Sequence, residues 1–280
     1  MTPEAALRRA GSGRHGLRGL RLLHRLHAGP LKSSWLAGRG AERFVLRIDE
    51  PLAAGFAPDR GVEFAAWSAA AAAGIAPEPL LLWPGPPAVL VTRHAPGRAW
   101  RAAELALPGR IETLAGLLRR LHESRLPGQP LDLEASLDGY ARRAGGRHAR
   151  QLARAARRLM ADCLQGPSTL CHHDPIPANV VGLRKPLLID WEYAALGDPL
   201  FDLAVLLQHH RLPAALAGRL TRAYFGAAAR VPVVRLTLAR RLYDHVHCLW
   251  LLALAVAAPL TPAQQTQLAT VTRRLNNKLE

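Results

Sequence analysis

Two short segments of the chain carry side chains suited to chemistry at phosphorus. The first contains Asp174 and, five residues later, Asn179, and the second is an apolar run that ends at Asp190. Amide and carboxylate oxygens suit Mg²⁺, which keeps several waters and bridges substrate phosphates. A carboxylate beside that ion, here Asp174, would accept the proton of an alcohol that attacks a phosphorus atom.

The two segments are predicted to meet, because the chain between them has the pattern of a β-hairpin. Residues 180–183 form one strand, 184–185 the turn, and 186–189 the returning strand. A two-residue tip places Asn179 opposite Asp190, and cross-strand partners have Cβ atoms about 5 Å apart. This register predicts one metal ion shared by the two side chains.

The residues around this hairpin resemble a known family. The string His172-x-Asp174-x-x-Pro177-x-Asn179 is followed by Leu-Ile-Asp-Trp-Glu over 188–192 and by Gly-Asp-Pro-x-x-Asp-Leu-Ala over 197–204. Together they are similar to the aminoglycoside phosphotransferase and choline kinase family, small-molecule relatives of the protein kinases, and 190–193 is most similar to its choline kinase and bacterial thiamine kinase branches. The resemblance implies an α+β, bilobal protein-kinase-like fold, with a small β-rich N-lobe over 1–92 and a larger, mainly helical C-lobe over 93–280.

The resemblance also implies a role for each matching residue. The implied roles are a catalytic base and the histidine that braces its loop, Asp174 and His172, two Mg²⁺ ligands, Asn179 and Asp190, and structural support from Asp198 and Asp202. The sequence agrees at Asp198, because aspartate followed by proline is typical of a helix N-cap with proline at the first helical position.

The N-lobe matches the family less closely. Where kinases place a phosphate-binding lysine, the strand 44–48 offers Arg47, which we assign to the α- and β-phosphates, paired with Glu63 on the next helix. The nearest lysine, Lys32, is the alternative, and whether Arg47 fully replaces the lysine stays open. A degenerate nucleotide loop is predicted over 28–34, with phosphate-binding backbone at Gly29, Ser33 and Ser34.

The implied activity is phosphoryl transfer from ATP, with Mg²⁺, to a hydroxyl of a small alcohol. A choline- or thiamine-like cation ranks first, and such cations are bound by aromatic faces and carboxylates. Candidate pocket residues are Trp191, Glu192, Tyr193, Tyr243, Asp244 and Trp250. The alternatives are an aminoglycoside or sugar phosphotransferase of the same fold and a nucleotide-binding pseudokinase. The sequence leaves open which alcohol is phosphorylated, whether ATP or GTP is the preferred phosphoryl donor, and what the oligomeric state is.

The elements that must position these residues divide near residue 96. Apolar runs separated by Gly and Pro turns predict strands within 18–48 and at 80–83 and 88–92, around one helix over 62–73. Helical periodicity then predicts helices over 111–123, 133–158, 199–209, 214–229, 236–258 and 262–278. The segment 168–197, which holds the hairpin, interrupts them.

The composition excludes fibrous and disordered classes, since 49% of the residues are apolar and 21% are charged. The net charge of +16 would suit a polyanion-binding protein. However, the arginines are spread along the chain and no aromatic-interleaved stripe accompanies them, so we expect no nucleic-acid partner and keep polyanion binding as the alternative. The Arg-rich segment before residue 28 resembles a transit peptide or is an exposed start of the domain, and its function is open.

The cysteines and the apolar runs indicate the compartment. Three cysteines without a CxxC pair predict a reducing compartment, and we expect the cytoplasm. The apolar run 248–260 is shorter than the roughly 18 residues of a membrane span, so we expect no span. A transition-metal cluster over 171–174 is the alternative reading of that segment, but adjacent ligands do not easily converge on one tetrahedron.

Overall fold

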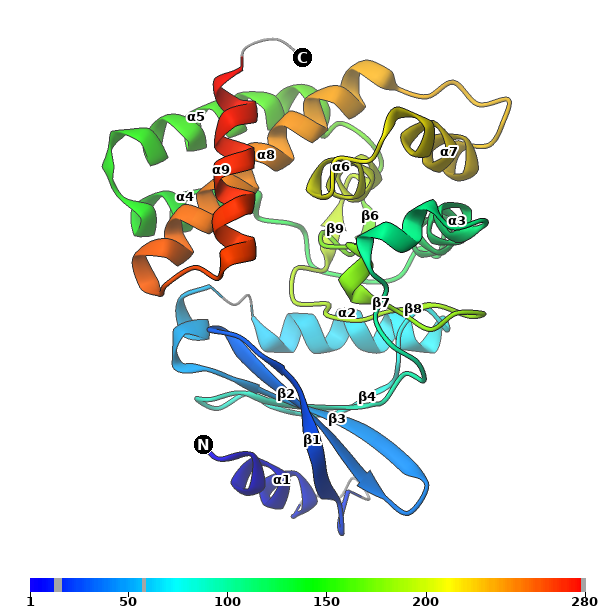
Figure 1. Ribbon diagram of the computed structural model, residues 1–280, viewed down its shortest axis with the longest axis vertical. Helices are drawn as coiled ribbons and strands as arrows, with labels where there is room; N and C mark the ends of the chain where they lie inside the picture. The colour runs from blue at the N-terminus through cyan, green and yellow to red at the C-terminus, as the bar shows by residue number, and fades with distance from the viewer. Residues whose placement is uncertain (13–16, 57–58, 278–280) are drawn as a thin grey trace.

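The chain folds into a sheet-containing lobe and a helical lobe (Figure 1), as seen in a computed structural model that describes residues 1–12, 17–56 and 59–277. The first lobe contains α1 (Pro3–Gly11), β1 (Arg21–Ala28), β2 (Lys32–Arg39), β3 (Glu42–Asp49), η1 (Pro51–Gly55), α2 (Arg60–Ala72), β4 (Pro79–Trp83) and β5 (Val89–Arg93). The second contains η2 (Ala102–Ala106), α3 (Arg110–Glu123), α4 (Leu133–Ala144), α5 (Gly146–Cys163), β6 (Thr169–Cys171), η3 (Pro177–Asn179), β7 (Val180–Val181), β8 (Leu187–Leu188), β9 (Ala195–Gly197), α6 (Pro199–His209), α7 (Ala214–Phe225), α8 (Val233–Ala257) and α9 (Pro262–Asn276). This arrangement confirms the predicted α+β bilobal fold.

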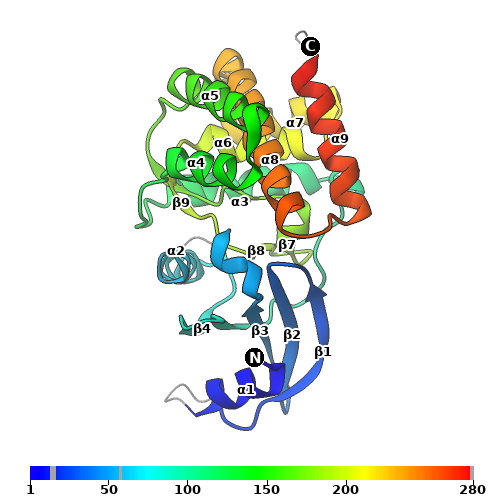
Figure 2. The same ribbon diagram turned by 90° about the vertical axis from the view of Figure 1, so that its left-hand side faces the viewer.

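The N-lobe sheet is antiparallel in the order β1-β2-β3-β5-β4, and its two faces have different tasks. Side chains alternate along a strand, so Phe44, Leu46 and Ile48 of β3 point to one face and form a core with α1. Arg47, between them in sequence, points to the other face, toward α2. Figures 1 and 2 show α1 and α2 on opposite sides of the sheet, with α2 between the sheet and the helical lobe.

The helix α1 lies within the segment that we expected to be an exposed basic start. Thr2 caps it, because its Oγ1 accepts a hydrogen bond from the Ala5 N–H at 3.2 Å, and Pro3 stands at its first turn. Ala6 and Ala10 are buried against the sheet, whereas the basic residues follow in the last turn. The first residues are therefore part of the N-lobe core.

The C-lobe helices follow the predicted pattern with two corrections, one of which is that the helix expected over 214–229 ends at Phe225. The single helix expected over 133–158 is two helices, α4 and α5, because Gly145 and Gly146 both have positive φ, at 70° and 75°. Glycine adopts this conformation without the Cβ penalty of other residues, and it cannot continue a right-handed helix there. The end of the helix expected over 262–278 lies outside the described residues at 278. No helix in the described part of the chain is long and apolar enough to cross a membrane.

The hairpin between Asn179 and Asp190 is present, but the predicted register is wrong by one residue. Val180 pairs with Leu188 and Val181 with Leu187, so the connection has five residues, 182–186, in place of two. Asn179 therefore faces Ile189, whose N–H donates to the Asn179 carbonyl at 2.9 Å. Asp190 turns away from the ladder with φ 68°, a left-handed conformation that costs a non-glycine residue about 1 kcal/mol or more.

Candidate functional site

The segment that carries Asp174 is held in place by the buried side chain of His172. His172 is fully buried, and its Nδ1 accepts from the Asp174 N–H at 3.3 Å, which leaves Nε2 to donate to the Ile189 carbonyl at 3.0 Å. One imidazole thus joins the loop to the strand that leads to Asp190. His173 adopts φ 61°, a second strained position at this site. These contacts agree with the bracing role implied for His172.

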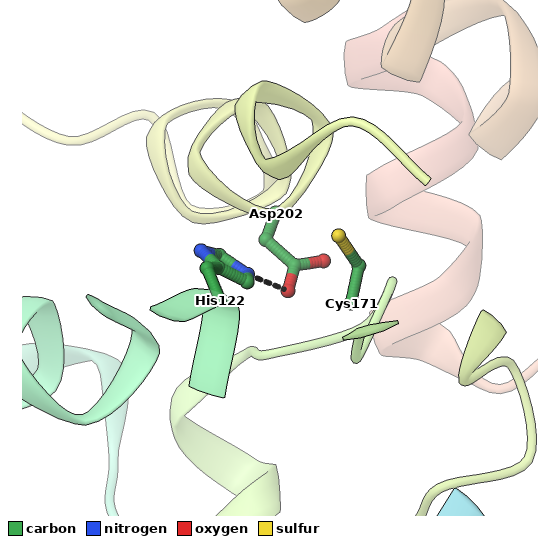
Figure 3. A group of neighbouring side chains, drawn as sticks. All are labelled: His122, Cys171 and Asp202. Carbon is green, nitrogen blue, oxygen red and sulfur yellow. Dashed lines mark hydrogen bonds and ion pairs between the residues drawn. The ribbon is translucent and has the colours of Figure 1, made fainter. Parts of the chain in front are cut away.

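Asp202, which belongs to α6, holds the same segment through hydrogen bonds to its backbone. Its carboxylate accepts from the His172 N–H at 2.9 Å and from the His173 N–H at 2.7 Å. His122 of α3 lies 3.0 Å from the same carboxylate (Figure 3). Burial opposes ionisation, but His122 and these contacts lower the pKa of Asp202 to about 2. The carboxylate is therefore ionised at neutral pH and holds the backbone of 172–173, which agrees with the support implied for it.

His122, Asp202 and Cys171 form the one cluster of potential metal ligands found among the described residues (Figure 3). Each member already has another partner: Asp202 holds the two backbone N–H groups, His122 Nδ1 lies 2.7 Å from the Tyr224 hydroxyl, and the Cys171 thiol donates to the Gly197 carbonyl at 3.4 Å. Burial raises the pKa of Cys171 well above its ordinary value, so the thiol stays protonated. We therefore interpret the cluster as structural.

Asp198 lies at the start of α6, where the sequence predicts a helix N-cap, and its side chain bonds to residues outside the loop 172–179. Its Oδ1 accepts from the Leu200 N–H at 2.9 Å, which makes it the N-cap, with Pro199 next. Its Oδ2 accepts from the Gly166 N–H at 2.6 Å and pairs with Arg235 of α8.

Asp174 itself is partly buried, and Asn179 orients its side chain. The Asn179 Nδ2 donates to the Asp174 Oδ2 at 2.8 Å and to the Asp174 carbonyl at 2.9 Å. Burial and the neighbouring Asp190 raise the pKa of Asp174 well above its ordinary value. A carboxyl with a raised pKa is a stronger base once it is ionised, which is the property that a proton acceptor needs.

Asp190 faces the cations of the N-lobe. Lys32 Nζ lies 2.5 Å from its Oδ1 and 2.6 Å from its Oδ2, and Arg47 lies 3.7 Å from its Oδ1. Burial opposes ionisation of Asp190, but the charges of Lys32 and Arg47 lower its pKa. The carboxylate is therefore ionised and has both of its oxygens turned toward positive charge, which suits a metal ligand.

Arg47 and Glu63 pair as the sequence predicts. The guanidinium donates twice, from one terminal nitrogen to Oε1 at 2.5 Å and from the other to Oε2 at 2.6 Å, and the two side chains are 8% and 1% exposed. Arg60, which the sequence did not single out, also donates to Glu63 at 2.7 Å. It makes two bonds to Asp49 of β3 and one to Glu192 at 3.1 Å, so it links the sheet, α2 and the C-lobe.

The nucleotide loop predicted over 28–34 is wrong in its extent. The turn contains only Gly29, Pro30 and Leu31, with the Gly29 N–H donating to the Lys32 carbonyl at 3.0 Å, because β2 already begins at Lys32. Ser34 pairs with Arg47 and shares its face, whereas Ser33 pairs with Ile48 and shares the face of the α1 core. Both serines lie within the strand β2, and phosphate binding by their backbone N–H groups stays a prediction.

Three of the tentative acceptor-pocket residues have structural tasks. Trp191 is fully buried, stacks edge-on against His172 and donates from its indole to the Leu188 carbonyl, so it is a core residue. Asp244 is paired with Arg274 of α9 and accepts from the Gln208 amide at 2.5 Å. Glu192 is occupied by Lys32 and Arg60. These three carboxylate or aromatic groups are not presented to a substrate in this state.

The charge of Asp174 acts on two tyrosines of the expected pocket. Burial raises the pKa of both Tyr193 and Tyr243 well above its ordinary value, and the Asp174 charge raises both further. The Tyr243 hydroxyl is 2.5 Å from His209 Nδ1, which fixes its ring. Trp250 lies two helical turns further along α8, and its indole nitrogen is buried without a partner.

Comparison with known proteins agrees with this geometry. The family model described as "Phosphotransferase enzyme family" matches residues 22–234. Protein LicA of Haemophilus influenzae is 34% identical over 87 residues, which cover 29% of this chain and 33% of that relative, so the match spans about a third of the relative's length. A choline/ethanolamine kinase family protein from Mesorhizobium loti is similar in structure, with a TM-score of 0.77 and 26% identity over 98% of this chain and 95% of that one. An aminoglycoside-3'-phosphotransferase of type VIII has a TM-score of 0.64 and 22% identity over 87% of this chain and 98% of that one. The chain therefore belongs to the phosphotransferase enzyme family and has a bilobal protein-kinase-like fold.

Proposed function

We propose that this protein is an ATP- and Mg²⁺-dependent kinase that transfers the γ-phosphoryl group of ATP to the hydroxyl of a small cationic alcohol, with the nucleotide between residues 1–92 and 93–280. One observation carries the proposal. The Asp174 carboxylate is oriented by Asn179 and lies next to Asp190, while Arg47 reaches to 3.7 Å of Asp190 from the sheet. A proton acceptor, oxygen ligands and a phosphate-binding cation therefore share one cleft.

The donor set fits Mg²⁺, which prefers carboxylate and amide oxygens together with substrate phosphates. Asn179 and Asp190 would hold the ion, and Asp190 already offers both oxygens to the Lys32 ammonium at 2.5 and 2.6 Å. When bound, the ion supplies positive charge against the negative charge of the transferring phosphates.

The remaining work falls to the side chains of this chain. Asp174 accepts the proton of the acceptor hydroxyl, while His172 and Asp202 keep its loop in place. Arg47, held by Glu63, binds the phosphates with the N–H groups that the carboxylate does not use. Catalysis of this kind depends on position and charge, since phosphoryl transfer needs little covalent chemistry from the protein.

The charges around Asp174 favour a small monocation over a polycation. Asp244 and Glu192, the carboxylates that would attract a polycationic aminoglycoside, are neutralised by Arg274 and by Lys32 with Arg60. Tyr193 and Tyr243 remain within range of the Asp174 charge, and aromatic faces bind quaternary ammonium groups. The name of the Mesorhizobium loti relative, a choline/ethanolamine kinase family protein, supports the same substrate class.

A coupled ADP-release assay with a panel of acceptors tests the proposal. Choline, ethanolamine and thiamine are compared with kanamycin, glucose and 3,3-dimethylbutan-1-ol, which has the shape of choline without its charge. We expect one of the cationic alcohols to have the highest kcat/KM, at least about tenfold above its neutral analogue, because a desolvated cation–π contact contributes about 2 kcal/mol.

The other outcomes of the panel identify the alternatives. A preference for kanamycin or glucose would replace the substrate class within the same fold. Mg·ATP binding without ADP release on any acceptor would indicate a pseudokinase. A steep salt-dependent affinity for nonspecific DNA without nucleotide binding would indicate a polyanion-binding protein.

The Arg47 and Glu63 pair gives a second test of the nucleotide site. Arg47→Lys should lower kcat/KM by a factor that corresponds to about 1–3 kcal/mol of transition-state stabilisation, because an ammonium replaces two directed hydrogen bonds with a point charge. Arg47→Ala should lower kcat/KM further. Glu63→Gln should be non-additive with Arg47→Lys, as expected for side chains in contact. The double-mutant cycle in steady-state kinetics measures this coupling, with Arg147→Lys on the exposed face of α5 as the control. Additive effects would show that Glu63 does not position Arg47.

A further inference from the structure

Lys32 is a second cation on the face of the sheet that carries Arg47, and the proposed mechanism does not use it. It begins β2 immediately after the turn at Gly29, and it pairs with Asp49, so its side chain shares the face of Ser34 and Arg47. It is one of only three lysines in the chain, against 37 basic residues in all. Its side chain is 15% exposed.

The Lys32 ammonium occupies the carboxylates that would hold a metal. Nζ lies 2.5 Å and 2.6 Å from the two oxygens of Asp190 and 3.0 Å from Oε1 of Glu192. Three oxygens around one cation satisfy its three N–H donors. Both oxygens of Asp190 are engaged, so a divalent ion and the ammonium compete for the same carboxylate.

The contact also crosses between the lobes. Lys32 belongs to the sheet, whereas Asp190 and Glu192 follow β8 in the catalytic segment. Arg60 reaches Glu192 from α2 at 3.1 Å and Arg47 lies 3.7 Å from Asp190, so three N-lobe cations converge on this segment. Arg60 is fixed by two bonds to Asp49, but Lys32 has no other side-chain partner among the described contacts and carries a flexible four-carbon stem.

We propose that Lys32 is a resident cation that exchanges partners: it holds Asp190 and Glu192 in the nucleotide-free protein and moves onto the phosphates when the Mg²⁺-nucleotide enters. The inference rests on the proposed function, since it takes a nucleoside polyphosphate as the incoming ligand. Two features support the exchange. Lys32 lies on the same sheet face as the phosphate-binding Arg47, and the divalent ion removes the charge that held the ammonium. Lys32 then neutralises carboxylates in one state and phosphates in the other.

Two binding measurements, made without turnover, test the exchange. In the nucleotide-free protein, Lys32→Met should bind Mn²⁺ at least about tenfold more tightly than the wild type, as followed by the electron paramagnetic resonance signal of free Mn²⁺. In EDTA, the same variant should bind metal-free ATP at least about tenfold more weakly, as measured by calorimetry. Lys32→Arg keeps the charge and should move both affinities less. Lys185→Met, at an exposed lysine in the β7–β8 connection, should change neither.

A third variant separates direct phosphate contact from simple screening of Asp190. In an Asp190→Asn background, Lys32→Met should still weaken metal-free ATP binding by about the same factor if the ammonium touches phosphate. Loss of that effect in the Asn background would overturn the exchange, as would shifts of Mn²⁺ and ATP affinity in the same direction or no shift in either. Failure of the wild type to bind any nucleotide would overturn the proposed function and the phosphate half of the exchange, and the Mn²⁺ arm would still report whether Lys32 holds the carboxylates.

Discussion

Asp174→Asn should lower kcat by at least about 10², the usual contribution of a positioned base, while Mg·ATP still binds. The geometry should survive, because the new amide can accept with its oxygen the bond that Asn179 donates at 2.8 Å. What is lost is the ability to take the hydroxyl proton. Steady-state ADP release and calorimetry with Mg·ATP measure the two quantities, and Asp162→Asn, at an exposed carboxylate at the end of α5, is the matched control.

The stability of the same variant should move in the opposite direction. Burial and Asp190 raise the pKa of Asp174, so the folded protein binds a proton on this carboxyl more tightly than the unfolded chain does. A raised acid pKa contributes stability at low pH, and that contribution is lost as the pH rises from the ordinary value of Asp, about 3.9, through the raised one. At pH 7 the ionised carboxylate therefore destabilises the wild type, and Asp174→Asn should unfold at a higher temperature.

The two readouts together distinguish a catalytic role from a structural one. A residue that only supports the loop would lower activity and stability together when it is replaced. Near-normal turnover in Asp174→Asn would remove this carboxylate from the mechanism. A lower melting temperature with reduced turnover would assign it to the support of the loop, as we assign Asp202.

The sequence was sufficient to predict the hairpin segment because its residues are close along the chain. Asp174, Asn179 and Asp190 lie within one short stretch, and the hairpin brings them together with few alternatives. Even so, the register was wrong by one residue, since a five-residue connection replaced the expected two-residue tip. Turn length is set by local backbone conformation, here Gly182 at φ 95°, which the pattern of apolar residues does not report.

The ion-pair network was not predictable in the same way. Lys32 meets Asp190 across 158 positions and Arg60 meets Glu192 across 132, and the sequence holds no periodicity that links such distant residues. The pairing of Arg47 with Glu63 was found because the family resemblance names both positions. Arg60 stands three residues before Glu63 on the same helix face, and this spacing was the one available signal for its role.

Trp191, Glu192 and Asp244, expected in the acceptor pocket, have other contacts that the sequence did not indicate. Neighbouring residues of the string 190–193 have different surroundings, because Trp191 packs against His172 in the core whereas Tyr193 is within range of the Asp174 charge. Residue type alone predicts that each residue of 191–193 lines the acceptor pocket. Only the backbone turn at Asp190 decides which side chain faces which way.

Asp190→Asn should lower kcat by at least about 10³, because a ligand that helps to neutralise the transferring phosphates contributes several kcal/mol. Asparagine is preferred to alanine here, since Asp190 has φ 68° and asparagine tolerates this conformation better than most residues. The variant loses the negative charge but keeps the shape of the side chain. The Lys32 ammonium loses the charge of Asp190 and one of the two oxygens that it contacts at 2.5 and 2.6 Å, and it retains Glu192 at 3.0 Å.

The measurement that isolates this role is thermal unfolding with Mg·ATP and with ATP in EDTA. A ligand that binds only the folded protein raises the melting temperature according to its concentration and affinity. The melting temperature of the wild type should rise clearly more with Mg·ATP than with ATP in EDTA. The melting temperature of Asp190→Asn should rise by the same amount with both. The Asp162→Asn control should behave as the wild type. In the variant, metal-free ATP should bind at least as tightly as in the wild type, because a carboxylate that repels phosphate has been removed. An undiminished Mg²⁺-dependent gain in Asp190→Asn would show that other side chains hold the ion, and Glu192, which shares Lys32 with Asp190, would then be the carboxylate to replace next.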